Sequence, residues 1–376
     1  MPIWHRIYMK VLMLLSNPYL VDPRVQQEAN ALIEGEHEVK IIVWDRKMEY
    51  KKREFVGDVE IFRVHISDFK NDVLRNPIWW HRAYKLAKNL RREYKFEAVH
   101  SHDLDTLFPG VLLKKRFHIK LVFDAHEIFS YMIEGFVLKP VVYGARLMEN
   151  ILIPNADHII TVNEVFKRHY MRYGRPVTIV RNAKPLIYRE YEDTNNKVFT
   201  LIYIGIMSRD RFFPEIIDIV GNLEGVKLIL AGKKEGLYYQ MEEYSKKYQN
   251  VEFLGTIPTE QIYPLTRKAD ATFVLVDPRN KNNRYTVFNK QFEAMLCGRP
   301  IIVTKGTFAA EMTERYKCGL TVNYNKKDIR DAIITLRDDK RLREELGRNA
   351  FRAAKEIFNW ENEKKKLIRA YEEVSK

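Results

Sequence analysis

Short apolar runs alternate along the chain with segments whose apolar residues recur at helical spacing. The runs have the length of buried strands and the intervening segments have the period of amphipathic helices; examples of the runs are Lys10–Leu15, 39–44, 120–123, Phe199–Ile204 and Val226–Ala231. Such alternation is typical of parallel sheets covered by helices on both faces. The pattern comes in two series separated by the polar stretch 189–197, so we predict an α/β protein with two doubly wound domains.

The length of the chain supports the same organisation. A chain of 376 residues exceeds the size of most single hydrophobic cores, so two domains are expected. We place the first domain at 1–185, a linker at 186–198, the second domain at 199–358, and a charged helix that crosses back to the first domain at 359–376. Open α/β sheets bind ligands at the carboxyl ends of their strands, so we expect a site in a cleft across which the domains face.

Composition narrows the class of protein. Hydrophobic residues make up 46% of the chain and charged residues 30%, as in globular proteins. The run from Val11 to Leu15 is too short for a signal-peptide core, and no run approaches the roughly 20 apolar residues that cross a bilayer. Cys297 and Cys318 are too few for a disulfide framework, so we expect a cytoplasmic protein. The net charge of +14 indicates an anionic partner (nucleotide, nucleic acid or membrane surface), unless the surface is simply rich in both signs.

The segment 289–303 carries the most specific signal. Its pattern predicts a helix that starts with Asn289 and Lys290, stops at Gly298 and leads into a buried strand. A helix N-terminus offers N–H groups and partial positive charge to a phosphate, and Glu293 could accept hydrogen bonds from a ribose diol. This combination predicts a nucleotide-sugar site. In the alternative interpretation Glu293 only complements the helix dipole, or forms a simple ion pair with Lys290 three residues away.

A second group of basic residues follows the first strand of the second domain. Gly205 ends that strand, and Arg209 and Arg211 follow before Pro214 starts a helix. Two guanidinium groups in a strand–helix loop could neutralise a diphosphate, although they could also belong to a solvated basic loop. The chain has no glycine-rich dinucleotide fingerprint after its first strand and no Walker sequence, which weakens a dehydrogenase interpretation.

Polar residues of the first domain also follow predicted strand ends. His126 comes after the run 120–123, where it could act in the cleft as a hydrogen-bond donor or acid–base group, or be merely solvated. Asp103 and Asp105 form an Asp-x-Asp sequence of a kind that can bind a metal ion. They lie between a strand end and a helix start, where Asp105 is a plausible N-cap, so we expect no bound metal.

The segment from Arg75 to Lys95 is strongly basic. It holds seven basic residues against one acid, Glu93, together with Trp79 and Trp80. Basic residues with tryptophans suit a membrane interface and also suit nucleic acid. We favour peripheral contact with a membrane and expect no nucleic-acid partner. The alternative is a solvated helix whose tryptophans lie in the core.

Over nearly its whole length the sequence resembles the retaining GT-B glycosyltransferases of the large family 4. The most specific match is Asn289-Lys290 with Phe292-Glu293-Ala294-Met295 and Gly298-Arg299-Pro300; others are Asp22-Pro23-Arg24-Val25 with Glu28-Ala29, His100-Ser101-His102-Asp103-Leu104-Asp105, Asp124-Ala125-His126-Glu127, Thr161-Val162-Asn163-Glu164 and Arg181-Asn182. The resemblance implies the GT-B fold, with two Rossmann-like domains, and sugar transfer from a nucleotide donor.

The resemblance also implies roles for individual residues. Glu293 would bind the ribose and Arg211 the diphosphate, while His126, the catalytic candidate, would face the donor sugar from the first domain. The other candidates for the donor site are Gly205, Arg209, Asn289 and Lys290. Transfer would proceed with retention, without metal and without a cofactor other than the nucleotide-sugar co-substrate, for which a UDP- or GDP-sugar is expected.

Three positions depart from the family pattern. Tyr285 stands where many members carry a first glutamate, Ile206 replaces an arginine that often follows the glycine, and Phe212 replaces a glycine after the basic residue. A subset of the family shares the Asn-Lys pair before a single glutamate, which keeps activity expected but leaves the donor open.

We therefore expect a cytoplasmic glycosyltransferase that acts on a glycan or lipid-linked acceptor, with peripheral membrane contact through Arg75 to Lys95. Two alternatives remain open. A GT-B sugar-nucleotide epimerase would consume the donor without an acceptor, and a non-catalytic membrane- or RNA-binding module would not be stabilised by a nucleotide diphosphate.

Overall fold

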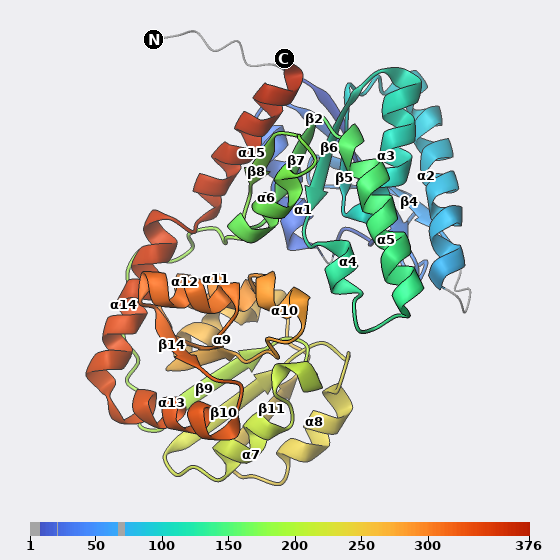
Figure 1. Cartoon of the computed structure of the whole chain (residues 1–376). Coiled ribbons are helices and arrows are strands. Elements are labelled where there is room, and N and C mark those ends of the chain that lie inside the picture. The colour runs from blue at the N-terminus through green and yellow to red at the C-terminus, as the bar shows by residue number, and fades with distance from the viewer. Residues whose placement is uncertain (1–7, 21, 67–71) are drawn as a thin grey trace, which may run out of the picture. The chain divides into compact units, whose positions relative to one another are not determined.

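The computed structural model describes residues 8–20, 22–66 and 72–376. The chain divides into two compact units, one comprising Met1–Arg181 with Glu363–Lys376 and the other Asn182–Asn362. Each unit is an α/β domain built on a largely parallel sheet with helices on both faces (Figure 1). The predicted fold class, two parallel-sheet α/β domains, is confirmed.

The first unit contains an eight-stranded sheet with strand order β3-β4-β2-β1-β5-β6-β7-β8. Its strands are β1 (Lys10–Leu15), β2 (Glu38–Asp45), β3 (Arg53–Val56), β4 (Val59–His65), β5 (Ala98–His102), β6 (Lys120–Ala125), β7 (His158–Thr161) and β8 (Val177–Ile179). All neighbours pair in parallel except β3, which runs antiparallel to β4 at the edge of the sheet. Strands β1, β5, β6 and β7 are buried along nearly their whole length because helices cover both of their faces.

The helices of the first unit form two layers. They are α1 (Pro23–Glu34), α2 (Asp72–Glu93), α3 (Leu104–Phe117), α4 (Phe129–Met132), α5 (Lys139–Leu152) and α6 (Glu164–Met171), joined by most of α15 (Trp360–Ser375). Figure 1 shows α2, α3 and α5 side by side on one face of the sheet, with α1 and α15 on the other. Helix α1 starts as predicted, with Pro23 in its first turn and the side chain of Asp22 accepting a hydrogen bond from the Val25 amide.

The second unit contains a six-stranded parallel sheet with strand order β11-β10-β9-β12-β13-β14. Its strands are β9 (Phe199–Ile204), β10 (Val226–Ala231), β11 (Val251–Gly255), β12 (Ala271–Val274), β13 (Ile301–Thr304) and β14 (Gly319–Val322), and its helices are α7 (Glu215–Gly221), α8 (Tyr238–Ser245), α9 (Ile262–Lys268), α10 (Lys281–Tyr285), α11 (Asn289–Cys297), α12 (Phe308–Tyr316), α13 (Lys326–Asp338) and α14 (Lys340–Glu356). Helix α11 has the predicted bounds and ends at Gly298 in the left-handed conformation.

The segment interpreted as a linker packs on the second unit. The carboxylate of Glu192 pairs with Arg267 at 2.9 Å, and its backbone carbonyl accepts a hydrogen bond from Arg299 at 2.6 Å. Asn196 donates to the Asp270 carboxylate at 3.0 Å. These contacts fix the segment to the outside of the second domain, although it contains no helix or strand.

The tryptophans of α2 lie inside the first unit. Trp79 is fully buried and stacks on Trp44 with 5.7 Å between ring centroids. Trp80 donates a hydrogen bond to the backbone oxygen of Asp105 at 2.6 Å and contacts Phe108. The prediction that these tryptophans serve a membrane interface is therefore wrong for Trp79, while Trp80 is half-buried with its indole N–H bonded to the protein. The alternative, a helix with core tryptophans and solvated basic residues, describes α2.

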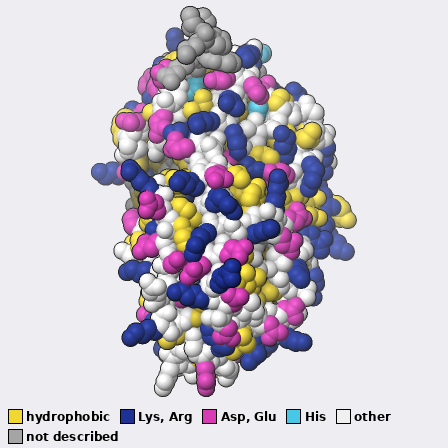
Figure 2. Space-filling model, turned by 90° about the vertical axis from the view of Figure 1, so that its left-hand side faces the viewer, with side chains coloured by type: hydrophobic (Ala, Val, Ile, Leu, Met, Phe, Trp, Pro, Cys, Tyr) yellow, Lys and Arg dark blue, Asp and Glu magenta, His cyan; other side chains and the backbone are white. Residues whose placement is uncertain are grey.

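The surface carries both signs of charge. Figure 2 shows Lys and Arg side chains interspersed with Asp and Glu over one face of the molecule, so the excess of +14 is not gathered there into a single basic patch. No helix among the described residues is long and apolar enough to cross a membrane.

Candidate active site

In the second unit, Lys290 lies directly against the backbone at the end of β9. Gly205 has φ of 150°, and a Cβ at this position would collide with the Lys290 ammonium group. The same ammonium lies 4.5 Å from the centroid of the Tyr203 ring, which favours a cation electrostatically. Glycine at position 205 thus serves a close approach, and the first turn of α11 delivers a cation to the carboxyl end of β9.

Arg211 lines the same pocket. Its guanidinium donates a hydrogen bond to the backbone oxygen of Ile206 at 3.3 Å and lies 5.9 Å from the centroid of the Phe288 ring. Apolar residues at the end of β12 and just after it wall the pocket, and two cations line it. Its lining is Tyr203, Arg211, Val274, Leu275, Val276, Phe288 and Lys290. An arginine and a lysine converging at one strand-end pocket suit a diphosphate.

Arg209 occupies a different place. It is in the same short turn as Arg211 but lines a separate hollow with Asp277, Arg279 and Tyr324. The Tyr324 hydroxyl donates to the Arg209 backbone oxygen at 3.2 Å. The structure therefore brings Arg211 and Lys290 together and sets Arg209 apart, so a contact of Arg209 with the donor stays a prediction.

Glu293 presents a half-buried carboxylate on α11. Within the part of the chain that the structure describes, it makes no hydrogen bond and no ion pair, so the simple Lys290–Glu293 pair considered above is not formed. Burial, together with the negative charge of Glu293, raises the pKa of the neighbouring Tyr263. Asn289 accepts a hydrogen bond from Lys184 at 3.0 Å. Glu293 is thus an acceptor group that a ligand could use.

Phe212 shows why a glycine is usual at its position. Its backbone is left-handed, with φ of 64° and ψ of 34°, which costs an L-residue about 1–2 kcal/mol. The Phe212 ring is buried and packs edge-on against Tyr324 with 4.9 Å between centroids. Burial of the ring offsets the backbone cost, so this departure from the family pattern preserves the turn that carries Arg211.

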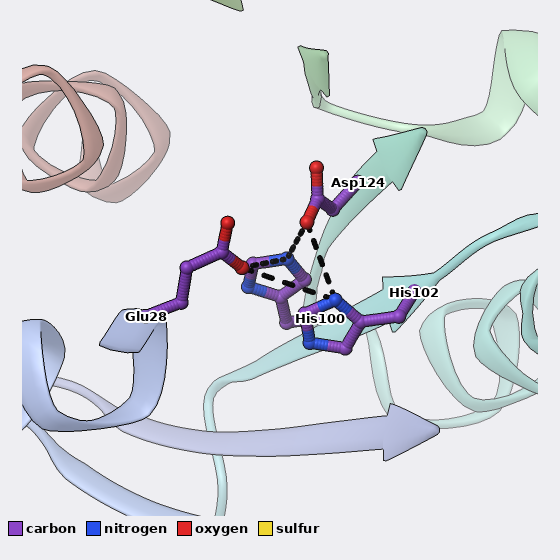
Figure 3. A group of neighbouring side chains, drawn as sticks. All are labelled: Glu28, His100, His102 and Asp124. Carbon is purple, nitrogen blue, oxygen red and sulfur yellow. Dashed lines mark hydrogen bonds and ion pairs between the residues drawn. The ribbon is translucent and has the colours of Figure 1, made fainter. Parts of the chain in front are cut away.

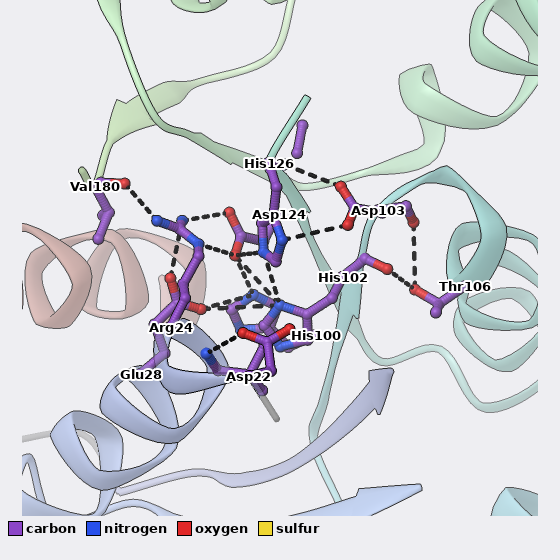
Figure 4. A network of polar contacts seen from close by, with 12 residues as sticks. Asp22, Arg24, Glu28, His100, His102, Asp103, Thr106, Asp124, His126 and Val180 are labelled. Atoms are coloured by element: carbon purple, nitrogen blue, oxygen red, sulfur yellow. Dashed lines mark hydrogen bonds and ion pairs between the residues drawn. The ribbon is translucent and has the colours of Figure 1, made fainter. Parts of the chain in front are cut away.

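In the first unit, buried charges gather at the carboxyl ends of β5 and β6 (Figure 4). Arg24, in the first turn of α1, donates two hydrogen bonds to Asp124, at 2.8 and 3.3 Å, and a third to the backbone oxygen of Val180 at 2.8 Å. It also lies 2.9 Å from Glu28 one turn later. Burial opposes the charge of Asp124, but Arg24 and His126 hold the pKa of this carboxyl well below its usual range.

His126 lies between two carboxylates. Its Nε2 is 2.8 Å from Asp124 and its Nδ1 is 3.2 Å from Asp103, whose carboxylate also accepts a hydrogen bond from the His126 backbone amide at 3.0 Å. Burial disfavours a charged ring, yet Asp103 and Asp124 together raise the pKa of His126 from 6.5 to about 10. The ring is therefore an imidazolium at neutral pH, with both N–H groups directed at carboxylates.

Asp103 holds a strained backbone in order to face His126. Its φ of 60° and ψ of 169° fall in a region populated almost only by glycine, and such strain concentrates at functional sites. It occupies the N-cap position of α3, but its side chain makes no capping hydrogen bond and turns to His126 instead. The prediction that Asp105 caps this helix is wrong, because α3 begins at Leu104 and Asp105 lies within its first turn.

Two histidines and two carboxylates form a buried group that could in principle hold a metal (Figure 3). Potential ligand atoms of Glu28, His100, His102 and Asp124 lie within 4.8 Å of one another, and imidazole with carboxylate is a donor set that Zn²⁺ accepts. Arg24, however, already bridges both carboxylates through its guanidinium. The group thus contains its own cation, which already offsets the charge of both carboxylates and so weakens their attraction for a metal.

Protonation states support a hydrogen-bonded network instead. Burial lowers the pKa of His100, and burial together with His100 lowers the pKa of His102 to about 3, so both rings are neutral. His102 Nδ1 is 3.2 Å from Asp124, and His100 Nδ1 is 2.9 Å from the Tyr371 hydroxyl on α15. Burial raises the pKa of Glu28 well above its usual range despite Arg24. Asp124 is therefore the principal counter-charge of Arg24.

Comparison with known proteins defines the class to which this arrangement belongs. The model of Glycosyltransferase Family 4 matches residues 23–183, and the model of Glycosyl transferases group 1 matches residues 199–339. An uncharacterized glycosyltransferase of Methanocaldococcus jannaschii is 26% identical over 380 residues, covering 98% of this chain and 99% of that protein. The protein is a glycosyltransferase, and the chain belongs to family 4.

Solved structures share the fold. Sucrose-phosphate synthase from Thermosynechococcus elongatus superposes with a TM-score of 0.79 at 15% identity, covering 97% of this chain and 99% of that chain. HepE of Anabaena, in complex with UDP, superposes with a TM-score of 0.70 at 14% identity and covers 97% of this chain and 100% of that chain. The predicted GT-B fold is thereby confirmed.

Proposed function

We propose that the protein transfers a sugar from a nucleoside-diphosphate sugar to an acceptor hydroxyl, with retention at the anomeric carbon and without a bound metal. The observation that carries this proposal is the meeting of Arg211 and Lys290 in one strand-end pocket. Glu293, on the same helix as Lys290, adds a carboxylate without a partner among the described residues. Two cations suit a diphosphate, and a carboxylate suits the ribose diol. The UDP complex of the Anabaena protein makes a UDP-sugar the first donor to test.

The chemistry expected of this site is electrostatic. As the bond between the sugar and the diphosphate breaks, negative charge grows on the leaving group, and Arg211 and Lys290 are already placed in one pocket to stabilise it. The sugar becomes oxocarbenium-like and is attacked by the acceptor hydroxyl. We assign to His126 the contact with the transferred sugar that the family resemblance implies. Because both of its nitrogens face carboxylates, His126 would supply positive charge rather than act as a base.

Removing either donor-site group should weaken nucleotide binding in a distinguishable way. Glu293→Ala should cost about 1–3 kcal/mol of UDP affinity, the usual loss for hydrogen bonds to a charged group. Arg211→Ala should weaken UDP far more than uridine, because it removes charge from the diphosphate. Isothermal titration calorimetry with UDP and uridine measures both effects, with Glu311→Ala on α12 as the matched control for a helix glutamate. Unchanged affinity in both site variants would remove these residues from the donor site.

Incubation with nucleotide sugars also distinguishes a glycosyltransferase from a sugar-nucleotide epimerase. Incubation with UDP- and GDP-sugars in the absence of acceptor should leave the donor sugar unchanged, apart from slow hydrolysis. Conversion to an epimeric nucleotide sugar, detected by chromatography, would instead identify a sugar-nucleotide epimerase. A UDP-dependent rise in melting temperature is expected for either enzyme, since a ligand that binds only the folded state stabilises it.

Transfer should not depend on a metal ion. Basic residues supply the charge at the donor pocket, and Arg24 already neutralises the buried carboxylates of the first unit. We expect the rate of transfer in excess EDTA to equal the untreated rate, and the purified protein to hold well under one equivalent of zinc or manganese by mass spectrometry. Loss of activity on EDTA treatment that manganese restores would contradict this proposal.

We further propose that the acceptor is a glycan or a lipid-linked glycan and that the enzyme contacts a membrane peripherally. The support comes from the outer face of α2, where Arg82, Lys85, Lys88 and Arg92 are exposed. Each lysine or arginine near an anionic surface contributes about 1 kcal/mol of attraction. Because Trp79 and Trp80 are packed inside, the basic residues alone would form the contact made by this helix.

A further inference from the structure

Helix α5 and the turn before it expose a run of large apolar side chains. Leu138 is 77% exposed and Leu147 is 60% exposed, and both belong to a wider set that we call the α5 apolar face: Phe136, Leu138, Val141, Tyr143, Leu147 and Ile151. Within α5, Tyr143, Leu147 and Ile151 recur every four residues, which places them on one side of the helix, while Val141 lies at the edge of the buried side. Soluble proteins rarely leave so many large side chains together in water unless the surface meets a partner or a membrane.

The opposite side of α5 is also apolar. Val142, Ala145 and Leu152 are buried against the first unit and hold the helix in place. A helix that is hydrophobic on both sides is normally buried on both sides. Here one side packs on the domain, while the other meets none of the residues that the structure describes closely enough to bury it.

The charges around this face are those that suit an anionic surface. Lys139 is exposed at the start of α5, and Arg146 lies 5.9 Å from the Tyr143 ring. Of the two acidic residues of the region, Glu134 pairs with Arg146 at 3.5 Å, so these two charges offset each other, and Glu149 is buried and bonded to Ser130. The excess positive charge beside the face is therefore that of Lys139.

Further basic residues lie on the neighbouring helices. Helix α3 packs between α5 and α2 (Figure 1) and exposes Lys115 and Arg116, while α2 exposes the basic residues named above. An apolar strip on one helix with basic side chains on the next two combines the two contributions that bring an interfacial helix to a bilayer, apolar burial and attraction to anionic lipids.

We propose that the α5 apolar face docks on an anionic lipid bilayer, with its apolar side chains at the boundary between headgroups and acyl chains and the nearby cations on the headgroups. This relocates the main membrane contact from the tryptophans of α2 to α5, and it does not depend on which sugar is transferred. A second copy of this chain is the other occupant that such an apolar face could meet, and the experiment below includes it as an outcome that would overturn the proposal.

Vesicle co-sedimentation tests this surface directly. At low salt the full chain should sediment with vesicles that contain phosphatidylglycerol and much less with pure phosphatidylcholine, and high salt should weaken binding by screening. The double variant Leu138→Glu with Leu147→Glu should reduce the bound fraction about tenfold, because it places carboxylates at the apolar boundary. Phe55→Glu is the matched control, since Phe55 is 67% exposed on edge strand β3 of the same unit and should leave binding unchanged.

Three outcomes would overturn the proposal. The first is wild-type protein that stays in the supernatant with anionic vesicles at low salt. The second is equal binding by wild type and the double variant. The third is a wild-type dimer by light scattering that the double variant converts to a monomer, which would assign the face to a second copy. Circular dichroism and thermal melts of the same variants check that they fold, and calorimetry with UDP keeps this test separate from donor binding in the second unit. If the double variant fails to fold, Leu147→Ser should still lower binding.

Discussion

Replacing Asp124 by asparagine is expected to lower the free energy of unfolding by about 3–5 kcal/mol, the usual cost of leaving a buried charge without its partner. Asp124 is fully buried and receives two hydrogen bonds from Arg24, which is itself only 8% exposed. Glu28 cannot take over this role fully, because burial raises its pKa and favours the neutral form. Chemical denaturation followed by circular dichroism at neutral pH measures the loss.

A second ion-paired aspartate of the first unit shows whether the loss of stability comes from burial of the charge or from ion pairing alone. Asp157 pairs with Lys114 at 2.7 Å but is 27% exposed, so Asp157→Asn should cost no more than about 1 kcal/mol. The pH dependence gives an independent check. The pKa of Asp124 lies below its usual 3.8, so its contribution to stability is present above that pH and is lost as the pH falls through the folded-state value. Equal losses of unfolding free energy in Asp124→Asn and Asp157→Asn would show that Arg24 finds another partner.

The fold could be predicted from the sequence because buried parallel strands leave a strong local signal. Strands covered on both faces read as continuous apolar runs, and β1 and β9 have the bounds that their runs predict. Strand β3 (Arg53–Val56) was missed because it is an edge strand with alternating exposure, paired with β4 on one side only, and its sequence resembles a polar loop. A short edge strand depends on its partner rather than on its own composition.

The donor pocket was predictable in part. Arg211, Lys290 and Glu293 each lie at a strand–helix junction, and the carboxyl ends of parallel strands share one edge of a sheet, so the local pattern placed them in one region. What the sequence could not show is which side chains meet. Lys290 packs on Gly205, while Arg209 turns to a separate hollow although it is two residues from Arg211.

The buried network of the first unit went unrecognised for a different reason. Arg24 and Glu28 come from α1, while His100 and His102 come from β5, and their roles arise only when α1 packs against β5 and β6. One signal was present, because Arg24 and Glu28 lie one turn apart and next to the apolar residues that α1 buries. Two charged residues on the buried face of an amphipathic helix indicate a buried partner, since an unpaired charge there would be too costly.

Periodicity also failed to locate the exposed apolar surface. In α2 the basic composition suggested a tryptophan-rich interface, but Trp79 is buried against Trp44 and Trp80 is half-buried against Phe108. In α5 apolar residues occur on both sides of the helix, and a sequence pattern does not say which side meets the domain. Only the tertiary structure shows that Leu138 and Leu147 remain outside.

Replacing Asp103 by asparagine is expected to make both the charge of His126 and the rate of transfer depend on pH in the neutral range. In the wild type, His126 should remain an imidazolium up to about pH 9, because Asp103 and Asp124 raise its pKa from 6.5 to about 10. Asparagine keeps the size of the side chain but removes one of these two charges, so the pKa should fall by at least about one unit, equivalent to about 1.4 kcal/mol. The effect should be largest above pH 7, since burial raises the pKa of Asp103 itself to about 7.

Histidine carbon chemical shifts followed by NMR, together with pH profiles of kcat/KM, measure this change. If the positive charge of His126 assists transfer, the wild-type profile should stay level up to about pH 9, while the variant should lose activity as the pH rises above 7.

The free energy of unfolding should depend on pH in the same direction as the activity. A pKa above the unfolded value of 6.5 stabilises the fold fully below that pH, and the contribution is lost as the pH rises through about 10 in the wild type and earlier in the variant. Asp45→Asn, which alters a carboxylate 3.5 Å from His65, should leave the titration of His126 unchanged. A wild-type His126 that titrates near 6.5 would show that its ring does not pair with these carboxylates in solution.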